Sequence, residues 1–320
     1  MRPDRPLAAA LAAGPVLLDG GLSNQLEDQG CELTDALWSA RLLADEPRQI
    51  EAAHAAYARA GARVLITASY QATFEGFARR GIGPAEAARL FGRSVRLARR
   101  AGAATDHEVW VAASVGPYGA LLADGSEYRG RYGLSVRELE RFHRPRIEAL
   151  VAAGPDVLAL ETVPDVDEAE ALLRVAEEYG LPVWLSYTVA DGRTRAGQRL
   201  DTAFGLVTGH DLVIAAGVNC CAPAEADRAV EVAAEVTGGP VVVYPNSGER
   251  WEAGGRGWVG ESTFEPGRVR AWRAAGARLV GGCCRVGPDR VAELAALLDA
   301  PGGPAGATRP PERGVVTRSQ

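Results

Sequence analysis

The feature that most constrains the fold of this chain is a regular alternation of short apolar runs with helical segments. Eight runs of five to eight residues have the length of buried strands. The expected strands cover residues 16-20, 63-70, 109-116, 157-163, 183-189, 213-220, 241-246 and 278-283. The expected helices cover residues 45-60, 85-103, 135-153, 165-178, 201-208, 223-236, 262-275 and 288-299. Eight consecutive βα units predict an α/β protein with a (β/α)8 TIM barrel.

The length of the chain favours a single domain. Its 320 residues, of which 47% are hydrophobic, are enough to form one large core. We therefore expect one barrel domain over residues 1-300. Residues 301-320 are rich in Pro and Gly and lack apolar periodicity, so a disordered tail is expected there.

Composition excludes several classes of function. A formal net charge of -6 with scattered charges gives no basic face for nucleic acid or an anionic membrane, so small molecules are the expected partners. No run approaches the roughly 20 apolar residues that span a bilayer. The chain contains no lysine, which excludes Schiff-base chemistry and lysine-anchored pyridoxal phosphate.

The location is predicted from the N-terminal segment and the cysteines. Residues 7-18 resemble a short signal peptide but lead straight into the first expected strand, so we interpret them as part of the barrel. An odd count of five cysteines fits a reducing compartment better than a disulfide framework. We therefore expect a cytoplasmic protein.

Polar residues fall at the carboxyl ends of the expected strands, which is where a TIM barrel places its chemistry. Three of them are cysteines: Cys220 ends the sixth strand, and Cys283 and Cys284 end the eighth. Strands six and eight are near neighbours in a closed ring, so the three sulfurs are expected to meet. Zinc favours tetrahedral thiolate coordination, and three protein ligands leave the fourth position open for a reacting ligand. The pattern predicts a catalytic zinc site that binds and activates a substrate thiol.

The remaining cysteines and the histidines have simpler interpretations. A single buried cysteine is usually core filler, and it is the matched set of three that favours a metal. Cys221 is expected to face away as a structural residue, with a role as alternative ligand left open, and Cys31 to be an incidental thiol in a loop. The four histidines avoid the strand ends, which favours surface or helix positions over metal ligation. They are His54, His107, His143 and His210.

A long segment follows the third expected strand. Residues 120-133 bear glycines and tyrosines, and long βα loops on a barrel often act as lids or position substrates. Asp124, Tyr128 and Tyr132 are the side chains in this segment most able to contribute.

Eight short motifs together resemble the homocysteine S-methyltransferase family. They are DGGLSNQLEDQG (19-30), TASYQAT (67-73), GPYGA (116-120), DGSEYRG (124-130), ETVP (161-164), GVNCCAP (217-223), YPNSGE (244-249) and GGCCRVGP (281-288). The resemblance covers roughly residues 15-299, and the combination of GVNC with GGCC is highly specific. The small enzymes that use S-methylmethionine are the most similar subgroup.

The resemblance implies a reaction and a set of site residues. Homocysteine would enter as the fourth zinc ligand, lose its proton and attack the methyl group of a sulfonium donor, S-methylmethionine or S-adenosylmethionine, to give methionine. Cys220, Cys283 and Cys284 would be both the zinc ligands and the catalytic residues, and Asp19 and Glu161 would hold the amino group of homocysteine. The side chains expected to line the donor pocket are Tyr70, Gln71, Tyr187, Tyr244 and Asn246.

Alternatives remain open at this stage. The acceptor can be another thiol or a selenol, and the protein can instead bind zinc or homocysteine without turnover. Asp19 can simply stabilise a glycine turn, and Glu161 can be a solvent-facing cap of the following helix. Both acidic residues together with the tyrosine-bearing loop favour an enzyme, because a pure metal binder needs neither.

Overall fold

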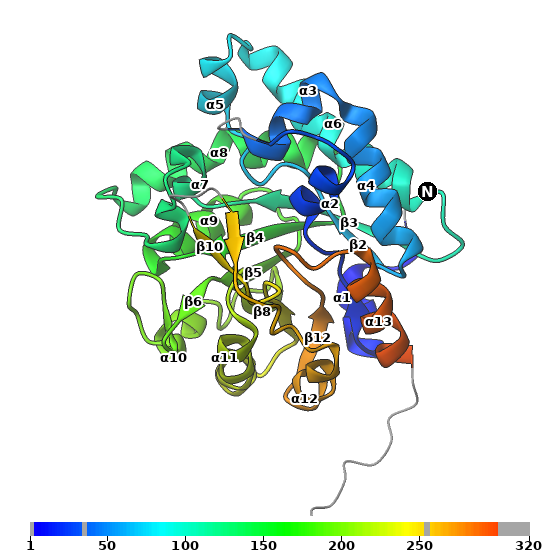
Figure 1. Cartoon of the computed structure of the whole chain (residues 1–320). Helices are drawn as coiled ribbons and strands as arrows, with labels where there is room; N and C mark the ends of the chain where they lie inside the picture. The colour runs from blue at the N-terminus through cyan, green and yellow to red at the C-terminus, as the bar shows by residue number, and fades with distance from the viewer. Residues whose placement is uncertain (1–2, 34–36, 253–256, 300–320) are drawn as a thin grey trace, which may run out of the picture.

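Eight parallel strands form the centre of the protein (Figure 1). The computed structural model describes residues 3-33, 37-252 and 257-299. The strands follow the order β1-β12-β9-β8-β5-β4-β3-β2. Their bounds are β1 Val16–Leu17, β2 Val64–Ile66, β3 Trp110–Val115, β4 Val157–Val163, β5 Val183–Tyr187, β8 Val213–Asn219, β9 Val241–Tyr244 and β12 Ala277–Val280. The predicted tail at 301-320 lies outside the described residues.

The two ends of this strand order meet and close the ring. Leu18 forms a parallel bridge with Val64, and the Asp19 amide donates to the Val64 carbonyl at 3.1 Å. The (β/α)8 barrel prediction is therefore confirmed, with all eight expected strands present as one domain. Several strands end earlier than predicted, as β2 does at Ile66 and β12 at Val280. The backbone leaves the ladder at these carboxyl ends, so many of the polar residues lie in turns above the ring.

The helices form the outer layer, and each predicted helix is present. The bounds of the main helices are α4 Pro47–Arg59, α6 Pro84–Gly102, α8 Val136–Ala152, α9 Val166–Glu177, α10 Leu200–Gly205, α11 Pro223–Thr237, α12 Val269–Ala274 and α13 Pro288–Asp299. Local sequence sets their starts. Ser135 and Glu138 form a capping box at α8, and Pro223 opens α11. None of the described helices is both long enough and apolar enough to traverse a lipid bilayer.

Shorter elements decorate the connections. They are α2 Leu22–Asp28, η1 Trp38–Arg41, α3 Leu42–Asp45, α5 Phe74–Arg79, α7 Tyr118–Leu122, η2 Ser126–Tyr128, η3 Pro266–Arg268 and the hairpins β6 Val189–Ala190 with β7 Arg193–Thr194 and β10 Arg250–Glu252 with β11 Gly257–Val259.

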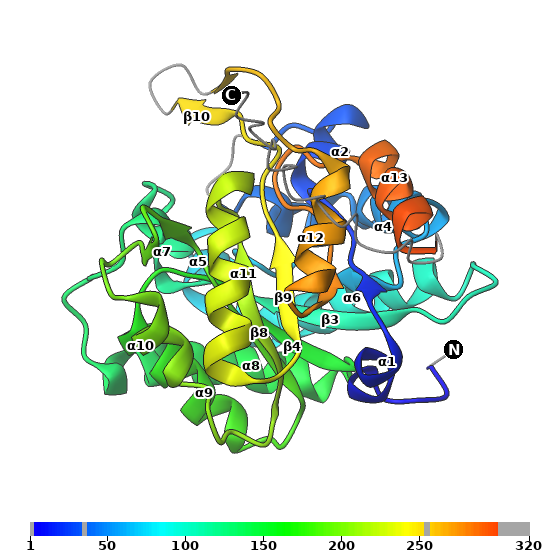
Figure 2. The same cartoon turned by 90° about the horizontal axis from the view of Figure 1, so that it is seen from below.

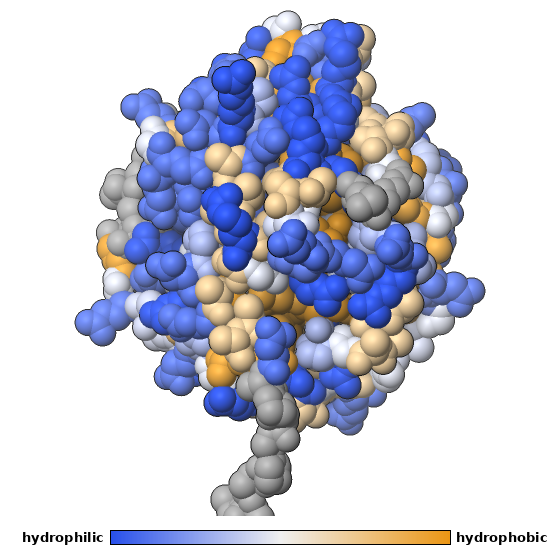
Figure 3. Space-filling model, turned by 90° about the vertical axis from the view of Figure 1, so that its right-hand side faces the viewer, coloured by the Kyte–Doolittle hydropathy of each residue, from blue (hydrophilic) through white to orange (hydrophobic). Residues whose placement is uncertain are grey.

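The face in Figure 3 is mainly hydrophilic with small apolar areas. Among the described residues, Leu122 is the one large hydrophobic side chain recorded as exposed.

The N-terminal segment forms a floor beneath the barrel. Helix α1 (Leu7–Ala13) buries Leu7 and Leu11 in the same cluster as the inward-facing strand residues. The indole nitrogen of Trp110, at the start of β3, donates to the Arg5 carbonyl at 3.0 Å. Figure 2 shows α1 and the β10 hairpin at opposite ends of the molecule. The interpretation of residues 7-18 as part of the barrel is therefore correct, and the opposite end is the mouth.

Candidate active site

Three cysteine sulfurs meet at the carboxyl ends of the strands. Cys220 directly follows β8, and Cys283 and Cys284 lie in the turn after β12. The Cys220 and Cys284 sulfurs are 3.7 Å apart, and those of Cys283 and Cys284 are 4.0 Å apart. A tetrahedral metal with metal–sulfur distances of about 2.3 Å requires sulfurs about 3.8 Å apart. No fourth His, Cys, Asp or Glu side chain joins the cluster among the described residues. The arrangement therefore fits a metal with one open position.

The segment after β9 ties the two cysteine turns together. The amide of Asn246 donates to the Cys221 carbonyl at 2.9 Å, while its side-chain Oδ1 accepts from the Cys284 amide at 3.2 Å. Cys220 itself has a φ of +52°, which is unusual outside glycine. This strained backbone at a strand end aims a thiol at the centre of the mouth. Asn246, expected in the donor pocket, therefore also positions two of the thiols.

The three thiols favour a shared cation. Hydrogen bonds from Cys283 and then Cys284 lower the pKa of Cys220, whereas the same bonds raise the pKa of the other two thiols. Three thiolates at this spacing repel one another. A divalent cation removes that conflict, and its binding would release protons.

Two carboxyl groups are buried beneath the same opening. Asp19 Oδ2 accepts from the Ile66 amide at 2.8 Å, and its Oδ1 has no hydrogen-bond partner. Glu161 accepts from Tyr244 at 2.9 Å and from Ser114. Burial raises the pKa of Asp19 well above its usual range and that of Glu161 to about 7. Two such groups are poised to receive a cation with several N–H donors.

The structure contradicts the two alternative interpretations, in which Asp19 only stabilises a glycine turn and Glu161 is a solvent-facing helix cap. Glu161 is only 6% exposed, and helix α9 is capped by Asp165, whose side chain accepts from the Asp167 amide. Asp19 is 1% exposed and bonds to β2 rather than to the following glycine turn. Both carboxyl groups therefore belong to the polar interior of the mouth.

Strand β4 is irregular where it carries Glu161 and Thr162. The pairing of β4 with β5 shifts register between Leu160 and Val163, and Thr162 has a φ of +58°. The Asn219 side chain holds this turn, because its Oδ1 accepts from the Thr162 amide and its Nδ2 donates to the Thr162 hydroxyl, both at 2.7 Å. A β-branched residue rarely adopts a positive φ, so this strain marks a functional position. Sequence reasoning missed Asn219, although it lies inside the GVNC motif.

The predicted pocket side chains divide into two groups. The Tyr244 hydroxyl lies inside the barrel and also bonds to Trp184 and Ser186. Burial, and then the charges on Glu127 and Cys220, raise the pKa of Tyr70, so its hydroxyl lies near the thiol cluster. The Tyr70 backbone is fixed by the buried Arg146, which donates to its carbonyl at 3.0 Å. Gln71 is buried beside it.

The assignment of Tyr187 to the pocket is wrong. Its ring packs against Phe204 in the layer between strands and helices, and its hydroxyl donates to the Ala203 carbonyl at 3.0 Å. Alternation along β5 explains the error, because Trp184 faces inward and residues at odd spacing from it face outward. Ser186 is the inward residue at this end of β5.

The segment after β3 contributes one side chain to the thiols. The Tyr128 hydroxyl, in η2, is 3.2 Å from the Cys220 sulfur. Asp124 is exposed and accepts from the Ser126 amide, and Tyr132 packs against Tyr118 instead of reaching the thiols. Of the three candidates in this loop, Tyr128 therefore lies at the site.

The other cysteines and the histidines lie away from the cluster. Cys221 is buried in the apolar core, where burial raises its pKa, and Cys31 lies in the loop after α2, as predicted, with its side chain in the same core. His54 and His143 lie within helices α4 and α8, and His143 bonds to Glu168 at 3.0 Å. Cys221 is therefore not among the grouped metal ligands.

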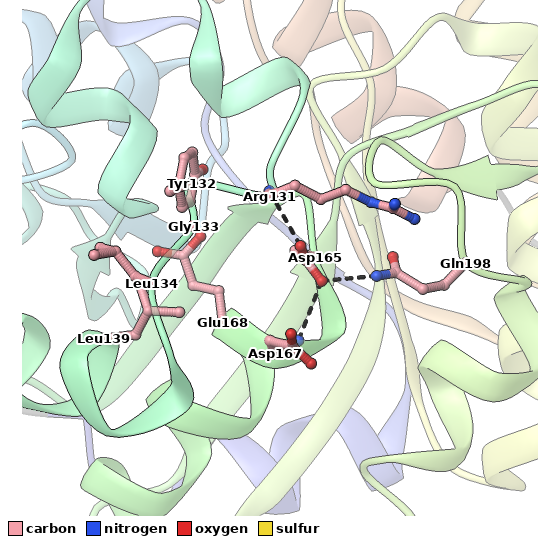
Figure 4. A pocket seen from close by; sticks show the side chains of 9 residues that line it. All are labelled: Arg131, Tyr132, Gly133, Leu134, Leu139, Asp165, Asp167, Glu168 and Gln198. Atoms are coloured by element: carbon pink, nitrogen blue, oxygen red, sulfur yellow. Dashed lines mark hydrogen bonds between the residues drawn. The ribbon is translucent and has the colours of Figure 1, made fainter.

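A hollow of about 410 Å³ lies beside the mouth (Figure 4). Asp165 organises it by accepting from the Arg131 amide at 3.2 Å and from the Gln198 side chain at 2.7 Å. None of the three grouped cysteines lines this hollow. The hollow lies between residues 131-139 and the start of α9, so we assign the chemistry to the thiol cluster instead.

Comparisons with known proteins point to one family. Residues 16–298 match the sequence profile described as homocysteine S-methyltransferase. The chain is 43% identical over 298 residues to the homocysteine S-methyltransferase YbgG of Bacillus subtilis (strain 168), covering 88% of this chain and 93% of that protein. It is 45% identical over 308 residues to the homocysteine S-methyltransferase of Escherichia coli (strain K12), covering 92% and 99%. The crystal structure of the metallated homocysteine methyltransferase MmuM from Escherichia coli superposes with a TM-score of 0.83 at 44% identity, covering 92% of this chain and 100% of that one.

Substitution of one grouped cysteine should remove the metal site. We expect Cys284→Ser to lose most of its bound divalent metal, because a hydroxyl is a much poorer ligand than a thiolate for a soft cation. The measurement is metal content after dialysis against a weak chelator. Cys221→Ala is the matched control and should keep the metal, since that thiol lies in the apolar core. Metal retained by Cys284→Ser would contradict the assignment.

Removal of the Asn219 side chain should destabilise the protein. Asn219→Ala leaves the buried Thr162 amide without a partner, which costs about 1–3 kcal/mol, measured by urea unfolding. The same change in a Thr162→Gly background should cost less, because glycine takes a positive φ without strain. Equal costs in both backgrounds would show that Asn219 does not hold the strained turn.

Proposed function

The chain belongs to the homocysteine S-methyltransferase family, and we propose that it transfers a methyl group from a sulfonium donor to the thiol of L-homocysteine, giving methionine. The observation that carries this proposal is the meeting of three thiols with two buried carboxyl groups at one barrel mouth. The three thiols suit the sulfur end of an amino thiol, and the two carboxyl groups suit its ammonium group.

We assign the metal as zinc, held by Cys220, Cys283 and Cys284. The sulfur spacing fits tetrahedral coordination, and a divalent cation would neutralise the negative charge of three thiolates held this close together. Zinc, when bound at such a site, lowers the pKa of a substrate thiol so that the thiolate forms near neutral pH. No dedicated strong base is then required.

Asp19 and Glu161 are proposed to bind the ammonium group of homocysteine. The free oxygen of Asp19 is available as an acceptor, and Ser114 and Tyr244 orient the Glu161 carboxyl group. An ammonium ion favours the charged form of both acids and so compensates for their burial. Fixing the amino end leaves the substrate sulfur directed toward the cysteines.

The transfer itself is a displacement at carbon. The homocysteine thiol gives up its proton, and its sulfur forms the new bond to the methyl carbon. The bond between that carbon and the donor sulfur breaks, and the electron pair stays on the donor sulfur, which becomes a neutral thioether. The three atoms must lie in line, so positioning supplies much of the rate. Tyr70 and Tyr128 present aromatic rings that attract a sulfonium charge, and Gln71, Tyr244 and Asn246 complete the surroundings.

We propose S-methylmethionine as the donor, with S-adenosylmethionine as the alternative. The bulky adenosyl group needs more room, and the Tyr128 hydroxyl already lies 3.2 Å from the Cys220 sulfur. We place the activity in the cytoplasm, because five free cysteines suit a reducing compartment.

Methionine formation tests the function directly. Reduced protein with homocysteine and S-methylmethionine is expected to produce methionine, and chelation followed by zinc addition should abolish and then restore turnover. S-adenosylmethionine and a selenol acceptor are assayed in parallel. Binding of zinc and homocysteine without product from either donor would instead favour a binding protein that lacks turnover.

The Glu161→Gln variant should weaken homocysteine binding. Loss of a charged partner for a buried ammonium is expected to raise the homocysteine KM about tenfold or more while zinc content is unchanged. Because the pKa of Glu161 is raised to about 7, the wild-type carboxyl group is charged above that pH and protonated below it. The difference in KM between variant and wild type should therefore be largest at pH 8 and narrow toward pH 6. A difference independent of pH would contradict the assigned role.

A further inference from the structure

Two side chains of opposite charge, each with one buried atom that lacks a hydrogen-bond partner, lie next to Tyr128 at the barrel mouth. Glu127 precedes Tyr128 in η2, and its Oε2 is buried without a hydrogen-bond partner. The guanidinium carbon of Arg195, beyond β7, lies 5.5 Å from the centre of the Tyr128 ring. The Arg195 Nε is likewise buried without a partner. Within the described ranges, the Arg195 guanidinium has no recorded ion pair.

Both side chains lie within electrostatic range of Cys220. Arg195 lowers the pKa of Cys220, although less than the neighbouring thiols and Tyr128 do. Burial, together with the charge on Cys220, raises the pKa of Glu127 to about 7. Glu127 also raises the pKa of Tyr70, so its carboxyl group lies on the Tyr70 side of the mouth. A ligand that reaches the thiols therefore passes within range of both groups.

These side chains come from other elements than the pair assigned to homocysteine. Burial raises the pKa of Asp19, the charge on Glu161 adds to this, and neither Glu127 nor Arg195 is among the groups that shift either acid. Asp19 follows β1 and Arg195 follows the β5 region, and these strands lie on opposite sides of the ring in the observed order. Glu161 lies in β4, between β3 and β5 in that order, so the loops that carry Glu127 and Arg195 lie on either side of it.

The chemistry of Glu127 and Arg195 fits one kind of head group. A planar guanidinium binds a carboxylate through two parallel hydrogen bonds, and a buried carboxylate binds an ammonium. An α-amino acid carries both groups on one carbon. A neutral molecule or a simple cation would satisfy at most one of the two unpartnered side chains.

We propose that Arg195 and Glu127 form a subsite for the α-amino-acid head group of the methyl donor. Arg195 binds the α-carboxylate, Glu127 binds the α-ammonium, and the Tyr128 ring beside the Arg195 guanidinium faces the sulfonium. This inference rests on the proposed function and assigns the donor class as an amino-acid sulfonium. A quaternary ammonium donor such as a betaine lacks the N–H groups that Glu127 requires.

The test combines two variants with two truncated donors. Arg195→Gln and Glu127→Gln are assayed with S-methylmethionine, with its analogue lacking the carboxylate, (3-aminopropyl)dimethylsulfonium, and with its analogue lacking the ammonium, 4-(dimethylsulfonio)butanoate. Each variant should raise the KM for S-methylmethionine about tenfold or more, and leave the homocysteine KM and the zinc content within about twofold of wild type. Arg199→Gln, an exposed arginine near the same hairpin that pairs with Asp201, is the matched control and should behave as wild type.

The truncated donors show which group of the donor each side chain binds. Arg195→Gln should lose its effect with the donor that lacks a carboxylate, and Glu127→Gln should lose its effect with the donor that lacks an ammonium. Variants that match wild type with S-methylmethionine, or that lose equally with every donor, would overturn the subsite. Wild-type protein that transfers no methyl group from any sulfonium would instead overturn the proposed function, and the inference with it.

Discussion

Closure of the parallel ring is the constraint on which the site depends. Since every strand runs in the same direction, every carboxyl end reaches the same mouth, and residues more than 200 positions apart meet there. Leu18 joins Val64 to complete this ring, and the adjoining Asp19 is thereby fixed against β2. The thiols after β8 and β12 approach because only β9 separates those strands. The chemistry follows from topology more than from any single loop.

At the mouth, burial and close spacing disfavour the charged forms of the carboxyl groups and the thiols. A shift of the Glu161 pKa from 4.5 to about 7 corresponds to roughly 3 kcal/mol against its charged form. The thiols face the same difficulty because their negative charges repel at short range. Cations relieve both conflicts, a metal at the sulfurs and an ammonium at the carboxyl groups. The free protein is therefore prepared for binding at some cost to its own stability.

The sequence predicts the barrel, its eight strands and the meeting of the cysteines, because the spacing of apolar residues and the position of a residue at a strand end can both be read from the sequence alone. The direction in which a side chain points is harder to predict. Tyr187 was assigned to the pocket although alternation from Trp184 predicts that it points outward. The bulge at Thr162 has no sequence signature, since it depends on Asn219 from a distant strand. The unpartnered charges of Glu127 and Arg195 arise from how two loops meet, which periodicity does not report.

The packing of α1 beneath the barrel determines how substrates enter the site and how products leave it. Leu7, Leu11 and Trp110 close the far end of the barrel, so the described structure leaves the mouth as the route for every molecule that enters or leaves. Removal of one methyl group from S-methylmethionine gives methionine, which is also what homocysteine becomes. Each turnover with this donor would therefore leave two molecules of methionine at the mouth. Accumulated methionine should then compete with both substrates, so a high methionine concentration in the cell would inhibit the enzyme directly.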